Sequence, residues 1–84
     1  MENKYLVELL VPSIDEKYSV YIPVNRRVGN VISLLNKCIF EITNGAYVGS
    51  NFTSLYDSDN NLKLDINELV RDTSIKNGST LVLL

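Results

Sequence analysis

The chain has 84 residues, of which 45% are hydrophobic, and its formal net charge is −2. This size and composition predict a single globular domain spanning residues 1-84 and exclude a disordered chain. A mildly acidic chain without a basic run also argues against nucleic-acid binding.

The residue types missing from the chain narrow its chemistry further. Histidine is absent and Cys38 is the only cysteine, which excludes histidine metal sites, histidine-dependent triads and a disulfide framework. The start, Met1-Glu-Asn-Lys4, lacks the charged and apolar regions of a signal peptide. No apolar run approaches the roughly 18 residues that span a bilayer. We therefore expect a cytoplasmic protein that does not insert into a membrane.

Two strand patterns joined by a short turn open the chain. In Lys4–Val11 the odd positions are all apolar or aromatic, while the even positions include Glu8. The odd positions are therefore expected to face the core. Residues 12–16 form the turn, and a second strand is predicted over Tyr18–Val24. Pro23 places this strand at a sheet edge or marks its end.

A helix is predicted next. Apolar residues recur there at helical spacing and form one stripe: Val28, Val31, Ile32, Leu35, Cys38, Ile39 and Ile42. Asn25 is the expected N-terminal cap, and Asn44-Gly45 is the expected stop. Cys38 is expected in the core, as a small apolar side chain without a catalytic role. Arg26 and Arg27, at the helix start, are interpreted as solvated side chains or as contacts for an acidic partner.

The second half of the chain predicts short elements. Gly, Ser and Asn residues make 46–53 a loop. The further elements expected in chain order are a strand at Ser54–Tyr56, a turn at 57–61, a strand at Leu62–Leu64, one helical turn at Asp65–Val70 and a strand at Thr80–Leu84.

The apolar run that follows the Asn77-Gly78 turn indicates the topology. A run this apolar is expected to be an inner strand, paired on both sides and covered by the helix. A right-handed crossover would place it parallel to the first strand. The predicted fold class is α+β: a β-grasp with a mixed sheet of four to five strands, one main helix and the order ββαββ(short helix)β.

Several short segments resemble ubiquitin and its relatives. Val28-Gly-Asn-Val31 with Leu35 is similar to the start of the ubiquitin helix, and Leu55-Tyr56 reaches Leu62 at the spacing between its third and fourth strands. The closing pattern resembles the bacterial YukD family (also called EsaB), which is associated with type VII secretion. It runs Val70-Arg-Asp72, Ile75-Lys-Asn-Gly78 and Leu81-Val-Leu-Leu84. The hairpin turn Ser13-Ile-Asp-Glu16 departs from that family's turns.

The resemblance implies a ubiquitin-like protein-binding module that is neither an enzyme nor dependent on a cofactor. The resemblance also implies protein partners, among them components of a type VII secretion system. The chain ends at Leu83-Leu84, whereas ubiquitin and the sulfur carriers work through a Gly-Gly tail, so covalent conjugation is not expected. An alternative is a β-grasp accessory subunit of a multicomponent enzyme.

A calcium-binding loop is a second alternative. Read as an EF-hand loop, the segment 57–68 places oxygen-bearing side chains at ligand positions: Asp57, Asp59, Asn61, Asp65 and Glu68. Leu62 stands where the loop normally needs glycine, and the preceding segment is not helical. The competing interpretation is a hairpin turn followed by a capped helical turn.

Strand alternation predicts one apolar surface on the face away from the helix. Its candidate protein-binding residues come from the first, third and last strands: Leu6, Glu8, Leu10, Tyr56, Val82 and Leu84. In the β-grasp order these strands are neighbours, and contiguous exposed apolar area usually marks an interface.

Overall fold

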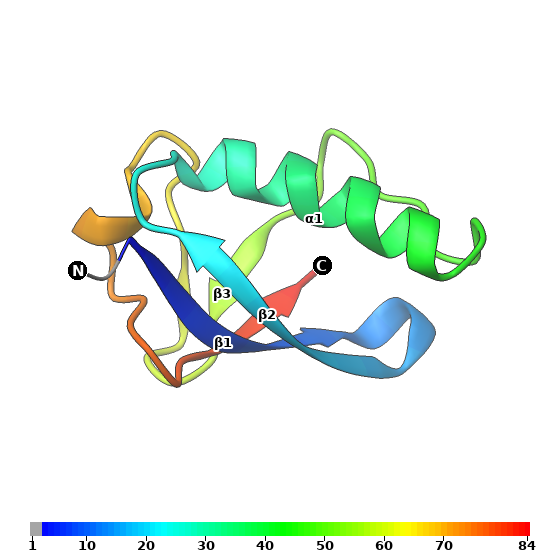
Figure 1. Cartoon of the computed structure of the whole chain (residues 1–84), viewed down its shortest axis with the longest axis horizontal. Helices are drawn as coiled ribbons and strands as arrows, with labels where there is room; N and C mark the ends of the chain where they lie inside the picture. The colour runs from blue at the N-terminus through cyan, green and yellow to red at the C-terminus, as the bar shows by residue number, and fades with distance from the viewer. Residues whose placement is uncertain (1–2) are drawn as a thin grey trace.

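One helix lies across one face of a five-stranded sheet in the computed structural model, which describes residues 3–84 (Figure 1). The strands run in the order β2-β1-β5-β3-β4. This is the predicted β-grasp with the predicted order of elements. Those elements are β1 (Lys4–Val11), η1 (Pro12–Ile14), β2 (Glu16–Pro23), α1 (Val28–Ile42), β3 (Leu55–Asp57), β4 (Leu62–Lys63), η2 (Val70–Asp72) and β5 (Thr80–Leu83).

The last strand, β5, is the centre of the sheet, as predicted. It pairs parallel with β1 and antiparallel with β3. Leu81 and Leu83 are almost fully buried on the helix side. At its end, Leu84 exchanges two backbone hydrogen bonds with Ser54. Because its backbone groups are paired on both sides, an apolar strand at this position leaves no exposed edge.

The Asn77-Gly78 turn does more than reverse the chain. Gly78 has a φ of +87°, a conformation that favours glycine. Its amide donates to the Leu6 carbonyl, and the Leu6 amide donates to Asn77 Oδ1 at 2.9 Å. The side chain of Asn77 therefore extends the β1–β5 pairing by one hydrogen bond beyond the strand itself.

The helix begins at Val28 and ends at Ile42, but its N-terminal cap differs from the prediction. Asn25 makes no cap, and its Oδ1 instead accepts a hydrogen bond from Arg71 Nη1. The amides of Val28 and Gly29 donate to the carbonyls of Glu68 and Ile66. A distant segment thus satisfies the free N–H groups that a helix start always carries.

This capping role also explains why the predicted helical turn over 65–70 was wrong. The carbonyls of residues 66 and 68 bond to the start of α1, so they are not available for a local helix. A short 3₁₀ turn forms slightly later, at Val70–Asp72, with Val70 fully buried. The predicted Asn25 cap and the predicted helical turn fail for the same reason. The segment around residues 66–71 and the segment at residues 24–29 satisfy each other's backbone hydrogen-bonding groups.

The C-terminal end of the apolar stripe is not covered. Cys38 is exposed, contrary to the prediction that it lies in the core, and Ile42 is 64% exposed. The buried residues of the stripe lie over the sheet: Val28, Val31, Ile32, Leu35 and Ile39. Since the sheet does not extend under this side of α1, one flank of the helix remains open.

The loop after α1 contributes a core residue that composition did not predict. Tyr47 is buried, its amide donates to Thr43 Oγ1, and its hydroxyl donates to Asn36 Oδ1. Burial raises the pKa of Tyr47, although a hydrogen bond with Thr53 acts in the opposite direction. The helix stop itself is as predicted, with Asn44 and Gly45 both at positive φ.

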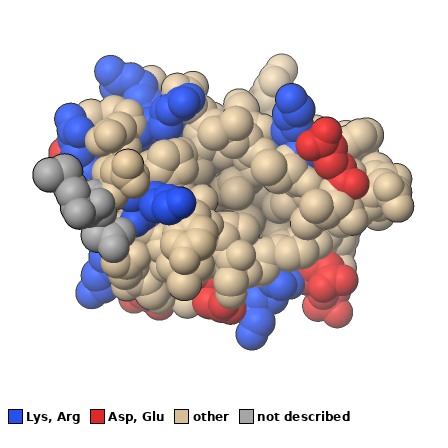
Figure 2. Space-filling view, in the orientation of Figure 1, with Lys and Arg blue, Asp and Glu red and all other residues tan. Residues whose placement is uncertain are grey.

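Charged side chains are unevenly spread over the face seen in Figure 2. Lys and Arg gather on the left of this view, where β2 ends and α1 begins, while the centre, between α1 and β2, is uncharged and hollowed (Figure 2). Within residues 3–84 no helix has the length and hydropathy needed to cross a bilayer.

Candidate functional site

Three adjacent strands bring Leu10, Val82 and Tyr56 into one row on the face of the sheet away from α1. Leu10 is the register partner of Val82, and Val82 is the register partner of Tyr56. All three are partly exposed. Directly opposed side chains on one sheet face lie within contact distance. We call this set the outer-face row.

Two further leucines extend the outer-face row toward the edge of the sheet. A hollow of about 300 Å³ is lined by Tyr56, Leu62, Val82 and Leu84 together with polar residues of the β3–β4 turn. Leu84 is 59% exposed and Leu62 is 49% exposed. The sequence did not predict Leu62 for this surface, because β4 has only two residues and shows no alternation.

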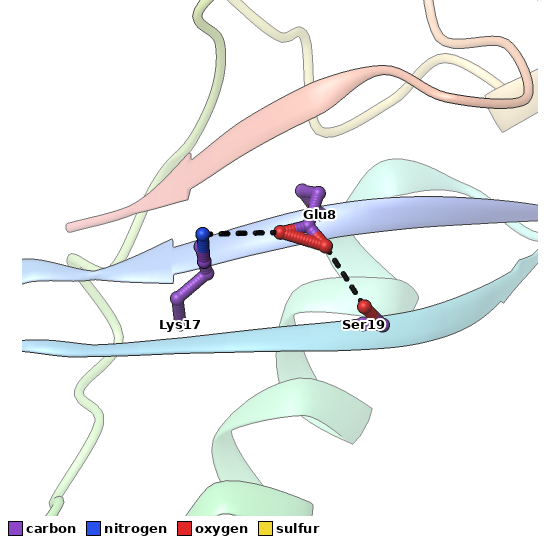
Figure 3. Close-up of polar contacts among 3 residues, drawn as sticks. All are labelled: Glu8, Lys17 and Ser19. Carbon is purple, nitrogen blue, oxygen red and sulfur yellow. Dashed lines mark hydrogen bonds and ion pairs between the residues drawn. The ribbon is translucent and has the colours of Figure 1, made fainter.

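Glu8 interrupts the predicted surface. Its carboxylate accepts a hydrogen bond from Ser19 Oγ at 2.8 Å and lies 3.8 Å from Lys17 Nζ (Figure 3). Both partners come from β2, so the carboxylate leans away from the outer-face row. The pair is exposed to solvent, and such pairs contribute little to stability. Glu8 is therefore a polar border of the row.

Leu6 lies beyond this border, in a separate hollow. That hollow has a volume of about 410 Å³ and is lined by Leu6, Tyr21, Asn77 and Gly78 with Glu8 and Ser19. The structure thus divides the six predicted residues, with Glu8 as the border between the other five. Leu10, Tyr56, Val82 and Leu84 lie together, whereas Leu6 is separated from them by Glu8.

The carboxylates of the possible calcium loop are engaged by the chain itself. Asp57 is fully buried, and its Oδ1 accepts hydrogen bonds from the amides of Asp59 and Asn60. Its Oδ2 accepts from Asn60 Nδ2 and Ser74 Oγ. Asp59 Oδ2 accepts from the Thr80 amide at 2.9 Å. These contacts fix the β3–β4 turn against the start of β5.

The remaining oxygen ligands of that loop are not gathered around Asp57. Asp65 Oδ1 accepts a hydrogen bond from the Asn67 amide, and the Glu68 backbone carbonyl accepts one from the Val28 amide at the start of α1. Among residues 3–84 there is no cluster of three or more histidine, cysteine, aspartate or glutamate side chains arranged to hold a metal ion.

The hydrogen bonds to Asp57 also change its proton affinity. Burial raises the pKa of Asp57, but the hydrogen bonds from Ser74, Asn60 and Asp59 lower it by more. The net pKa lies below the ordinary value because these donors stabilise the charged form. This carboxylate therefore stays ionised at neutral pH and serves as a structural acceptor.

The chain is similar in fold to solved structures of ubiquitin-like domains. It superposes with a TM-score of 0.80 on a chain of an ESX-5 inner membrane complex, at 13% identity, covering 99% of this chain and about a fifth (21%) of that one. It also superposes on the ubiquitin-like domain of the Mycobacterium tuberculosis type VII secretion system protein ECCD1, with a TM-score of 0.73, 12% identity and 99% coverage of both chains.

A third similar structure comes from a different class of protein. The chain superposes on a chain of a toluene 4-monooxygenase complex with a TM-score of 0.73, at 7% identity, covering 95% of each chain. No family model and no curated protein sequence matches the chain. At these identities the similarities show the fold, which is a ubiquitin-like β-grasp.

Proposed function

We propose that this protein is a ubiquitin-like interaction module that acts without catalysis as an accessory or regulator of a bacterial type VII secretion system. The role matches the YukD resemblance and implies a cytoplasmic location. The observation that carries the proposal is the outer-face row. It offers contiguous, partly exposed apolar side chains on three strands whose backbones are already paired.

The apolar side chains of the outer-face row are in contact with water, so covering them with a partner is favourable. Val82 sits between Leu10 and Tyr56 in register, and Leu84 follows on the same strand. Burying such an apolar cluster under a partner releases about 25 cal/mol for each Å² removed from water. An aromatic residue at the centre of an apolar patch is also typical of interface hot spots.

The secretion context comes from the fold neighbours. A ubiquitin-like domain of a type VII secretion system protein and a chain of an ESX-5 inner membrane complex both share the fold. These neighbours support a partner among secretion components for this chain.

The test is capture of partners from the native host. The wild-type chain and a Tyr56→Lys/Val82→Lys variant are used as bait, and the captured proteins are identified by mass spectrometry. Val48→Lys is the matched control, because Val48 is an exposed apolar residue in the loop after α1, away from the outer-face row. We expect a secretion ATPase or membrane component with the wild type and the control, and its loss with the double variant.

Retained capture by a correctly folded double variant would refute the outer-face row as the binding surface. Circular dichroism and thermal melting establish that the variant is folded.

The similarity to a monooxygenase complex favours a second candidate function, an accessory subunit of a multicomponent enzyme. Capture of oxygenase subunits in the same experiment, in place of secretion components, selects this candidate over the first.

A further inference from the structure

We propose that the groove between β2 and α1 binds an extended segment of a partner protein, which adds to β2 as a sixth strand of the sheet. This surface is distinct from the outer-face row. The groove has a volume of about 420 Å³. Its β2 side is formed by Tyr18 and Val20, and its α1 side is formed by Leu34, Leu35, Cys38 and Ile42. It is the uncharged hollow at the centre of Figure 2.

The free backbone of β2 is the first argument. β2 is an edge strand, paired with β1 only. The Val24 amide donates to the Asn3 carbonyl, and bonded positions alternate along an antiparallel pair. By the register, Tyr18, Val20 and Ile22 point their backbone groups at β1, while those of Lys17, Ser19 and Tyr21 point outward.

The length of this free edge limits the occupant. Pro23 has no amide hydrogen, so the outward donors end at Tyr21. At the other end Lys17 carries an exposed charge, a feature that discourages pairing at sheet edges. The bonding edge between them suits a segment of about five residues, at about 3.3 Å per residue.

The side chains that the groove requires are the second argument. An added strand would point alternate residues toward α1, over Val20 and against Leu34, Cys38 and Ile42. These helix residues form the uncovered flank of α1, and Leu34 and Ile42 are 45% and 64% exposed. Aliphatic side chains at alternate positions would cover them. Main-chain hydrogen bonds and alternate side-chain pockets together define strand addition.

A second copy of this chain is a poorer occupant. Pairing through its own β2 would present Tyr18, Val20 and Ile22 toward the groove side. Those side chains already pack on the core of their own molecule, and Ile22 is fully buried. A second copy therefore has no free side chain to fill the groove, whereas an extended peptide brings its own.

Charge indicates what flanks the apolar residues of the partner. Arg26 and Arg27 lie between the end of β2 and the start of α1 and are exposed. Arg27 Nη1 also donates a hydrogen bond to the Asn67 carbonyl. Lys4 Nζ lies 4.8 Å from the ring centre of Tyr21, at the same end of β2 but on the sheet face away from α1. Figure 2 shows lysine and arginine side chains gathered at the left of the view, where β2 ends and α1 begins. The occupant should carry acidic residues at the end that lies over them.

Two synthetic peptides test the proposal: Asp-Asp-Ile-Thr-Ile-Thr-Ile and Ile-Thr-Ile-Thr-Ile-Asp-Asp. Isoleucine occupies the positions facing α1, threonine the outward positions, and the acidic pair marks the two possible strand directions. Binding is followed by NMR titration of the labelled chain. We expect shifts at the Ser19 and Tyr21 amides for one peptide of the pair. The bound peptide should also slow alkylation of Cys38, the only thiol.

Ser19→Pro and Leu34→Lys are the deciding variants. Proline removes the outward amide hydrogen of Ser19 without removing a backbone hydrogen bond to β1. Ser19→Pro and Ser19→Ala both lose the side-chain bond to Glu8, so they differ in the amide hydrogen that Ser19→Ala keeps. The Ser19→Pro variant should bind the peptide about tenfold more weakly than Ser19→Ala. Leu34→Lys should weaken binding to a similar extent, with Val48→Lys as its control. If Ser19→Pro does not fold, Leu34→Lys and the Cys38 protection still decide.

Three results would overturn the proposal. The first is no binding of either peptide. The second is peptide shifts at Tyr56 and Val82 in place of β2. The third is a dimer of the chain itself, seen by sedimentation, that Leu34→Lys dissociates.

Discussion

The outer-face row and the β2–α1 groove are both apolar, yet they offer a partner different things. The strands under the row, β1, β5 and β3, are each paired on both sides, so the backbone is already satisfied. The groove lies beside β2, which has one free edge. A partner on the row gains side-chain contacts alone, whereas a partner in the groove also gains main-chain hydrogen bonds.

One small sheet can therefore offer two modes of binding. A paired sheet face selects a partner by the shape and polarity of its surface. A free edge selects by conformation, because only an extended chain can continue the hydrogen-bond pattern. The two surfaces therefore need not compete, even in a chain of 84 residues.

Leu81→Ala should have the largest effect, because it damages the core that both surfaces share. Leu81 is fully buried in β5, and truncation of a buried leucine costs about 2–5 kcal/mol of unfolding free energy. Val82→Ala, on the other side of the same strand, should cost less than about 1 kcal/mol because Val82 is partly exposed. Urea denaturation measures both. Equal losses would contradict the assigned inner and outer sides of β5.

Asp57→Ala should destabilise the end of the sheet next to the outer-face row and leave the groove ordered. It removes a buried carboxylate that accepts four hydrogen bonds, from Asp59, Asn60 (two) and Ser74. Unsatisfied buried donors cost about 1–3 kcal/mol. Hydrogen exchange should become faster in β3 and β4 than in β2. Uniform acceleration over all strands would argue against this local role.

The pH dependence of stability provides a related check on Asp57. The folded pKa of Asp57 lies below its unfolded value, so the stabilisation is fully present above the unfolded pKa of about 3.9. It is lost as the pH falls through the folded pKa. Thermal melts of the wild type and Asp57→Asn should therefore converge in strong acid. A constant difference at all pH values would exclude the ionised carboxylate as the cause.

A crossed pair of variants should separate the two surfaces directly. Val82→Lys should weaken the partner of the outer-face row about tenfold and leave the groove peptides unaffected, while Leu34→Lys should do the reverse. Calorimetric titration of each variant with each ligand measures the four affinities. Loss of both ligands in either variant would show that the two surfaces are coupled and do not bind independently.

Calcium should have the smallest effect. The Asp57 carboxylate is fully used by internal donors, and Asp59 bonds to the Thr80 amide. We expect neither heat nor a change in melting temperature with calcium at about 1 mM, which covers the weak end of natural sites. A measurable stabilisation would revive the calcium-binding alternative and change the assignment of the β3–β4 turn.

The sequence alone determined the layers of this protein, because strand alternation and helical spacing are local signals. Val7, Leu9 and Val11 are buried as their alternation in β1 predicted. The helix ends at Ile42, just before the predicted Asn44-Gly45 stop. The central position of β5 followed from its composition, since a run as apolar as residues 80–84 is stable only when it is paired and covered.

Tertiary structure decided the features that depend on residues far apart in the chain. Capping of α1 by the carbonyls of residues 66 and 68 replaced the expected Asn25 cap, and Glu8 turned toward β2 and divided the predicted surface. Helical spacing placed Cys38 on the apolar stripe, but only the width of the sheet determined how far that stripe is covered. The open flank of α1 beside the free edge of β2 is the result, because burial depends on what lies opposite a residue, which its own local pattern does not specify.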